Sequence, residues 1–316
     1  MRATRAKDGS IIGVYEAPDG PNAVIRVVKS TDAGVSWKAI GSVTSVLAKT
    51  HSISNPFIVQ HPDGRLLATS RNHDRISTDD YTYFRISLFG SDDGGATWSN
   101  LGNIDERRRD GVNGLWEPFL RVSRDGTLQA FYSSENNKDD QDNIMKISKD
   151  NGKTWSKPMP VSGQDKKSRD GMTGVADVDD KGNVICVFES EQNDIFYIDY
   201  VLSHDDGFTW PSRARLYTPK NKRDAGAPQI VNVGGILVAD FMSNEDVDKP
   251  GNNIDGGEMK VVTSKDGGRS WSNPVVTGTK GSHWPGLFTL DNSHFLGLWQ
   301  QDPTGLVSQK FRLDAC

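Results

Sequence analysis

Residues 148–156 read SKDNGKTWS, and this stretch is one of five copies of the pattern Ser-x-Asp-x-Gly-x-Ser/Thr-Trp. The copies, called boxes below, recur every 55 to 61 residues and begin at Ser30, Ser91, Ser148, Ser203 and Ser264. Chance alone does not produce five matches at so regular a spacing. A period of about 50 residues indicates one supersecondary unit per repeat, as in solenoids and propellers.

The residues of each box suit a tight turn. Serine and aspartate oxygens accept hydrogen bonds from nearby backbone N–H groups, and glycine adopts backbone conformations that other residues resist. Tryptophan adds a large apolar surface for packing. We therefore interpret the boxes as scaffold and exclude their aspartates from the catalytic candidates.

The segments between the boxes predict β-strands. A β-rich run such as FRISLFGS leads into a box, and a second run such as RLLATS or VICVFES comes before it, just after a turn. Each unit is expected to hold four antiparallel strands, which make one propeller blade. The sequence predicts an all-β fold, a six-bladed β-propeller with five boxes, as a single domain over residues 1–316.

The first and last units are expected to be incomplete. The last unit has no box and offers three strand-like runs, HWPGLFTL, HFLGLWQQ and LVSQKFRL. Met1 falls where other units carry proline. Two alternatives stay open: the sixth blade is one strand short, or an N-terminal closing strand is missing from this chain.

Composition excludes several partners. The net charge is −5 and the charges are mixed along the chain, with no basic stripe, so neither nucleic acid nor an anionic membrane is expected to bind. No apolar run approaches the roughly 20 residues that span a bilayer. The two cysteines, Cys186 and Cys316, suggest neither zinc nor a redox pair, and no metal or cofactor is expected.

The repeat gives a register from which a site can be located. The turn positions align five first-strand starts, namely Asn55-Pro56, Glu117-Pro118, Thr173-Gly174, Ala227-Pro228 and Trp284-Pro285. The second strands end at Glu16, Arg71, Ser133, Glu189 and Gln300, with Phe241 or Met242 as the equivalent in the fifth unit. Antiparallel strands place both sets on the same rim, opposite the boxes, at the mouth of the central funnel.

Residue types diverge at these positions, which is typical of a site built on a repeat. Glu117 and Glu189 lie on this rim in neighbouring units. Two carboxylates across a cleft are the minimum machinery of glycoside hydrolysis, in which one attacks or activates water and the other protonates the leaving oxygen. Asp177 competes with Glu117 under another alignment, and Glu16 is a weaker competitor. A strand-end glutamate is also commonly just a solvated surface residue.

Tryptophans support a sugar ligand. Of the eight, five belong to the boxes and Trp299 shares a register with blade-packing aromatic residues. Trp116 and Trp284 remain, both at the expected funnel mouth, where an indole can stack on the C–H face of a sugar. Core packing stays open for each of them.

Beyond the boxes, three segments resemble glycoside hydrolase family 93 of the sialidase-like superfamily, namely RATRAKDGSIIGVYE, GLWEPFLRVSRDGT and ICVFESEQ. That family consists of retaining exo-α-1,5-L-arabinanases that release arabinobiose from linear arabinan. The resemblance implies Glu117 as nucleophile and Glu189 as acid/base, an assignment of roles that the residues alone do not make. Retention requires carboxyl groups about 5 Å apart.

Substrate contacts are expected from residues on the same rim. Arg2 resembles the first-blade arginine of sialidase-like sites. The other expected contacts are Asn55, Arg71, Trp116, Asp177, Trp284 and Gln300.

Two other functions stay open. A sialidase would need an arginine cluster and a tyrosine nucleophile, and the chain has no tyrosine after Tyr217. A non-catalytic propeller that binds glycan or protein would need no facing carboxylates.

Further expectations follow from the arabinanase reading. Exo action would require loops that close the funnel, such as the segments 74–83 and 245–257. We expect a monomer that acts on a polysaccharide or oligosaccharide. Secretion is expected from the polymeric substrate, with a leader absent from this chain, and a cytosolic location stays open as the alternative.

Overall fold

The computed structural model describes residues 1–248, 254 and 256–313. Part of the segment 245–257 therefore lies outside the described residues, as does Cys316. The chain divides into two compact units, which we describe separately. The N-terminal unit is Arg2–Met159, and the C-terminal unit is Pro160–Cys316 together with Met1. The prediction of one domain over the whole chain stays a prediction.

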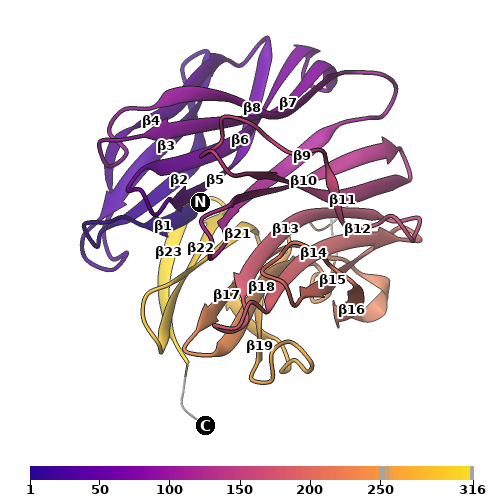
Figure 1. Cartoon of the computed structure of the whole chain (residues 1–316). Helices are drawn as coiled ribbons and strands as arrows, with labels where there is room; N and C mark the ends of the chain where they lie inside the picture. The colour runs from indigo at the N-terminus through magenta and orange to yellow at the C-terminus, as the bar shows by residue number, and fades with distance from the viewer. Residues whose placement is uncertain (249–253, 255, 314–316) are drawn as a thin grey trace. The chain divides into compact units, whose positions relative to one another are not determined.

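The N-terminal unit consists of antiparallel sheets whose strands pair in chain order (Figure 1). The first sheet is β1 (Arg2–Arg5), β2 (Ile11–Asp19), β3 (Asn22–Ser30) and β4 (Lys38–Leu47). The second is β5 (His51–Gln60), β6 (Leu66–Ser77), β7 (Asp80–Ser91) and β8 (Ser99–Arg108). Then follow β9 (Leu115–Val122), β10 (Leu128–Asn137) and β11 (Asp140–Ser148), and β12 (Met159–Ser162) begins at the last residue of the unit.

The C-terminal unit repeats the pattern. Its first strands are β13 (Arg169–Asp177), β14 (Val184–Gln192), β15 (Ile195–Ser203) and β16 (Ser212–Tyr217), followed by the short 3-10 helix η1 (Lys220–Lys222). The next sheet is β17 (Ala225–Val233), β18 (Ile236–Ser243), β19 (Glu258–Ser264) and β20 (Val275–Gly278). The last sheet has three strands, β21 (Ser282–Thr289), β22 (His294–Gln301) and β23 (Gly305–Arg312).

Three sheets have the predicted four strands in chain order, and the last sheet has the predicted three. The fold is all-β, with antiparallel sheets in a β-propeller arrangement. Within the described residues, no helix has the length and apolar character needed to cross a membrane.

Each box closes the turn between the third and fourth strand through the same hydrogen bonds. In the third box, the N–H of Gly152 donates to Oγ of Ser148 at 2.8 Å, and this hydroxyl donates to Oδ1 of Asp150 at 2.7 Å. The N–H and hydroxyl of Thr154 donate to the same carboxylate at 2.8 and 2.6 Å. The other four boxes repeat these bonds.

These bonds make the box aspartates structural anions. The Thr154 hydroxyl and N–H, followed by the Ser148 hydroxyl, lower the pKa of Asp150 to about 2. Gly152 has a φ of 88°, and a Cβ there would lie 2.3 Å from Cδ2 of Leu88. Glycine is therefore required at this position by both its backbone conformation and the close approach of the core.

The box serines offer a direct test of the scaffold. Ser91→Ala removes the acceptor of the buried Gly95 N–H, which lies 2.9 Å from Oγ, and leaves that donor unpaired. We expect a loss of about 1–3 kcal/mol in the free energy of unfolding, measured by urea denaturation. Ser99→Ala, at an exposed position in the same sheet, is the control and should stay within about 0.5 kcal/mol. Equal effects of the two changes would contradict the role of the box.

Candidate functional site

One backbone feature recurs at the start of five innermost strands. Each strand contains a β-bulge, at which two of its residues face a single residue of the next strand. The first residue of each bulge has a positive φ although none is glycine: Asn55 (51°), Glu117 (52°), Met172 (53°), Ala227 (53°) and Trp284 (55°). Such residues carry strain of order 1–3 kcal/mol and cluster at functional sites, and a bulge re-aims the side chain that it carries.

The bulges test the register taken from the sequence. Arg71, Glu189 and Gln300 each pair with the residue directly before a bulge, as does Ser133. These four predicted second-strand positions are therefore equivalent, and Met242 is their equivalent in the next sheet.

Two assignments from the sequence are corrected. In the fourth sequence repeat, the bulge consists of Met172 and Thr173, one residue before the predicted Thr173-Gly174. Asp177 does not take the position of Glu117. It is exposed and pairs with Val184, at the end of β13 and β14 that lies away from Glu189. Its side chain therefore lies near the turn of this sheet and not at the bulge, where Met172 stands in its place.

Glu117 is half-buried in the N-terminal unit, on the bulge of β9. The hydroxyl of Ser133 lies 3.2 Å from Oε2 of Glu117 and 3.2 Å from Oδ1 of Asn143. Ser133 and Asn143 are both fully buried, so their positions are fixed by the packing of β10 and β11. The carboxylate of Glu117 is thus held from inside its own sheet while part of its surface stays accessible.

Arg71 lies beside this region and carries an uncompensated charge. Its Cζ stands 5.2 Å from the ring centroid of Trp116, a cation–π distance. Within the described residues Arg71 forms no ion pair or hydrogen bond through its side chain, and its Nε is buried without a partner. A half-buried guanidinium in this state is a donor available to a ligand.

Trp116 is half-buried in a cluster of aromatic side chains. Its ring packs against those of His73, Tyr81 and Phe84, with centroids 5.1, 5.6 and 5.7 Å away. It also packs against the buried core of this unit. This is the core-packing alternative that the sequence left open for Trp116.

Asn55 and Arg2 also begin innermost strands of this unit. Asn55 is half-buried on the bulge of β5, next to the pair Ser54 and Arg71. Its side-chain amide makes no hydrogen bond within the described part of the chain. Arg2 begins β1, which packs against β5.

Glu16, the weaker competitor for a catalytic role, is exposed.

Glu189 is half-buried in the C-terminal unit, on β14, which extends three residues beyond the predicted strand end at Glu189 to Gln192. Its Oε2 accepts a hydrogen bond of 2.6 Å from the N–H of Ala227, on the bulge of β17. A Cβ on Gly226 would lie 2.7 Å from this oxygen and 2.9 Å from Cδ1 of Ile254. Glycine therefore leaves the space that the carboxylate of Glu189 occupies.

An apolar cluster and an exposed indole complete this part of the site. Met172, Ala227, Met242 and Ile254 pack in one buried cluster, together with Met259 and Trp299. Trp299 is 4% exposed, so its predicted packing role is confirmed. Trp284 is 46% exposed, as a stacking platform requires. Gln300, opposite His283 on β22, is also exposed.

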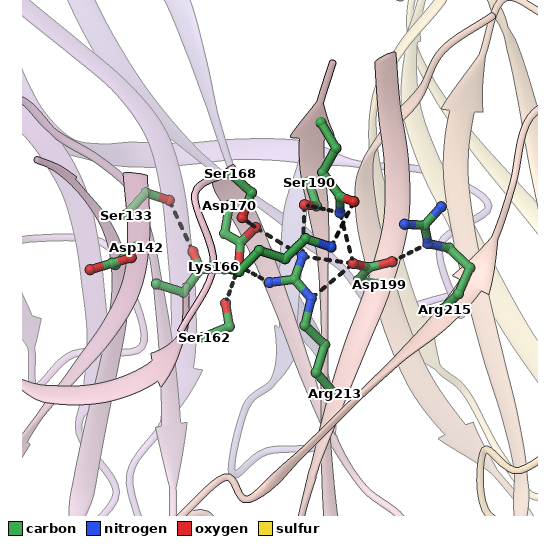
Figure 2. Close-up of polar contacts among 12 residues, drawn as sticks. Ser133, Asp142, Ser162, Lys166, Ser168, Asp170, Ser190, Asp199, Arg213 and Arg215 are labelled. Carbon is green, nitrogen blue, oxygen red and sulfur yellow. Dashed lines mark hydrogen bonds and ion pairs between the residues drawn. The ribbon is translucent and has the colours of Figure 1, made fainter. Parts of the chain in front are cut away.

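The sequence missed a charged cluster beside Glu189. Asp170 and Asp199 are 0% and 2% exposed, and Arg213 bonds both carboxylates (Figure 2). The segment SRARLY (212–217) carries Arg213 and Arg215 at alternating positions, hence on one face of a strand. This alternation was the one sequence signal of the charged cluster that was available. The aspartates that bind Arg213 lie on two other strands, so the sequence did not connect them with it.

The N-terminal two thirds of the chain match a known family model, that of the BNR repeat-like domain, over residues 4–222. The chain belongs to this family. No curated protein sequence matches it.

Solved structures extend the likeness to almost the whole chain. The GH93 α-L-arabinofuranosidase of Fusarium graminearum with arabinobiose is 21% identical, with a TM-score of 0.77 over 99% of this chain and 92% of that one. A Penicillium chrysogenum α-L-arabinanase complexed with arabinobiose is 19% identical, with a TM-score of 0.78 over 98% and 92%. The NanB sialidase of Streptococcus pneumoniae is 11% identical, with a TM-score of 0.66 over 99% and 68%.

At these identities the likeness shows the fold. It confirms the resemblance to glycoside hydrolase family 93 and the sialidase-like superfamily at the level of structure.

His73 gives a pH-dependent test of the aromatic cluster. Burial, and then the charge of Arg71, lower the pKa of His73 from 6.5 to about 3. The folded state therefore keeps this ring neutral at pH values where the unfolded chain takes up a proton. Its contribution to stability is complete above pH 6.5 and is lost as the pH falls toward 3.

We expect His73→Phe to remove about 2 kcal/mol of the loss in unfolding free energy between pH 7 and pH 5. The comparison concerns only this pH-dependent part, so a lower stability at every pH does not affect it. Ser99→Ala, at an exposed position without a titratable group, is the control and should keep the wild-type pH dependence. An unchanged pH dependence in His73→Phe would show that this ring is not buried in its neutral form.

Proposed function

We propose that the protein is a retaining, exo-acting glycoside hydrolase that cleaves α-1,5-linked L-arabinan and releases arabinobiose. The observation that carries this proposal is the pair of half-buried glutamates at positions where the repeat otherwise has no common residue. Glu117 stands on a bulge beside Ser133, and Glu189 stands on β14 against the N–H of Ala227. Solved structures with this fold include two that hold arabinobiose.

Each glutamate would have one role in a double displacement. Glu117 attacks the anomeric carbon and forms a glycosyl ester, while Glu189 donates a proton to the departing oxygen. Glu189 then takes a proton from water, which attacks the anomeric carbon and releases Glu117. The Ser133 hydroxyl, 3.2 Å from Oε2 of Glu117, would help to fix the position of this carboxylate.

The substrate contacts proposed besides the two glutamates are an exposed aromatic ring and polar side chains of the same register. The 46% exposed indole of Trp284 suits stacking on a pentose ring. Arg71 and Asn55 offer N–H groups to sugar hydroxyls, and Gln300 and Arg2 are the further contacts in this proposal. In this proposal the chain forms a six-bladed propeller. We propose a monomer that acts outside the cell, where its polymeric substrate lies.

Hydrolysis of linear α-1,5-arabinan tests this function, with chromatography of the products and sialyl-lactose as the control substrate. We expect arabinobiose as the sole early product and no release of sialic acid. Glu117→Gln and Glu189→Gln should each lose at least about 10³-fold in kcat, since each removes one carboxylate of a double displacement. A folded wild-type protein that binds arabinan without cleaving it would instead indicate a glycan-binding propeller.

The roles of the two glutamates are separable by leaving group. The acidic phenol of an aryl α-1,5-arabinobioside needs no proton from the enzyme to depart, so Glu189→Gln should still form the glycosyl-enzyme from this substrate. A burst of phenol followed by slow turnover is the expected result. Glu117→Gln should show no burst. The reverse pattern would exchange the two roles.

Gly226→Ala tests the position of Glu189 without changing any reacting group. The new Cβ would lie 2.7 Å from Oε2 and displace the carboxylate. A shift of about 1 Å is expected to lower kcat on the order of 10²-fold. The melting temperature should also fall, because the same Cβ lies 2.9 Å from Cδ1 of Ile254, so activity is measured at a temperature at which the variant is folded. Unchanged activity would show that Glu189 does not act from the position described here.

A further inference from the structure

Arg213 contacts both residues that flank Glu189. Its Nη2 lies 2.7 Å from Oγ of Ser190, and its Cζ stands 5.0 Å from the ring centroid of Phe188. Both neighbours of Glu189 on β14 are thus held by one guanidinium. The side chain of Arg213 is only 21% exposed, so little solvent competes for these contacts.

The same guanidinium joins two buried carboxylates. Nη1 and Nη2 lie 2.7 and 3.1 Å from the two oxygens of Asp170, and Nε and Nη2 lie 2.9 and 2.6 Å from Oδ2 of Asp199. Asp170 also accepts bonds from the hydroxyls of Ser162 and Ser168. A planar guanidinium bonded on several edges has a fixed orientation as well as a fixed position.

Strand pairing connects this cluster to Glu189. On β13, Asp170 pairs with Ser190, and the next residue, Gly171, pairs with Glu189 directly before the bulge. Gly171 and Glu189 are the last pair of β13 and β14 before the bulge, and Asp170, bonded to Arg213, lies in the pair next to it.

The cluster and the carboxylate of Glu189 lie on opposite faces of β14. Side chains alternate along a strand, so Phe188 and Ser190 face Arg213 whereas Glu189 faces the other way. On that second face, its Oε2 accepts the bond from Ala227. Figure 2 shows Arg213 between Asp170, Ser190 and Asp199. Arg213 thus binds β14 on one face, and the N–H of Ala227 binds Glu189 on the other.

We propose that Arg213 is a positioning residue that holds the carboxylate of Glu189 against the N–H of Ala227. The geometric part of this inference concerns the folded protein alone. Its consequence for catalysis rests on the proposed function. Arg213 itself acts through β14 and touches no reacting atom.

Hydrogen exchange at the Ala227 amide tests the geometric part without an activity assay. Exchange is measured by NMR on the full chain for wild type, Arg213→Met, Arg213→Lys and Ser190→Ala. Glu189→Gln provides the reference for a weakened acceptor. We expect at least about tenfold faster exchange at Ala227 in Arg213→Met, a smaller change in Ser190→Ala, and partial recovery in Arg213→Lys, which keeps the charge but loses the fork.

Two internal references separate this effect from general loosening. The Gly207 amide, bonded to Ser203 in the box of the same sheet, should keep its protection in every variant. Arg65→Met breaks another bidentate arginine–aspartate contact, with Asp92, and should leave the Ala227 amide unchanged. Unchanged exchange at Ala227 in both Arg213 variants overturns the proposal. Equal acceleration at Ala227 and Gly207 also overturns it, because the role of Arg213 would then be general stability.

Kinetics on arabinan provide the second readout. A displaced acid/base group should lower kcat on the order of 10²-fold in Arg213→Met while KM changes less than about threefold, with partial recovery in Arg213→Lys. If Arg213→Met does not fold, Ser190→Ala and Arg213→Lys carry the test. If the wild-type protein cleaves no glycoside, the proposed function is wrong, while the exchange experiment still tests the geometric part of the inference. If the enzyme is active and all three variants keep the wild-type kcat, Arg213 has no positioning role in catalysis.

Discussion

The bond from the glycine N–H to the serine hydroxyl in each box is the interaction on which the repeat depends. This hydroxyl is buried and links the backbone N–H of one side of the turn to the aspartate that binds the other side. Because the bond is local, it forms the same way in five places with different strands around it. The turn ends of the sheets are thereby fixed without any help from the opposite ends.

The opposite ends are free to differ, and the bulges show how they do so. Each bulge holds a residue at positive φ, and that residue changes from asparagine to glutamate, methionine, alanine and tryptophan along the chain. The bulge with a residue at positive φ is common to all five strands, while the side chain at that position differs in each. Glu117 is itself the bulged residue of its strand. Glu189 is not, but its carboxylate accepts a hydrogen bond from the N–H of the bulged Ala227.

The sequence predicted what is local and periodic. The boxes, the strand order and the positions of Arg71, Ser133, Glu189 and Gln300 depend on spacing within one repeat, so they were visible. The bulge at Met172 was placed one residue late because proline follows the bulged residue in the four other strands and is absent here. The burial of Trp116 was not decided, because its packing partners His73, Tyr81 and Phe84 lie on other strands.

Long-range charge pairing is the part that a single sequence does not reveal, and it matters most around Glu189. Asp170, Asp199 and Arg213 are separated along the chain and have no pattern in common, yet each aspartate would be poorly tolerated in the core without the guanidinium. A buried ion pair is a weak source of stability compared with apolar packing, so its presence beside Glu189 needs another reason. Its directional bonds fix the two neighbours of Glu189 in a way that apolar packing does not. The cluster thus makes β14 rigid at the place where the bulge of β13 interrupts the ladder, and a glutamate that must meet one backbone N–H requires that rigidity.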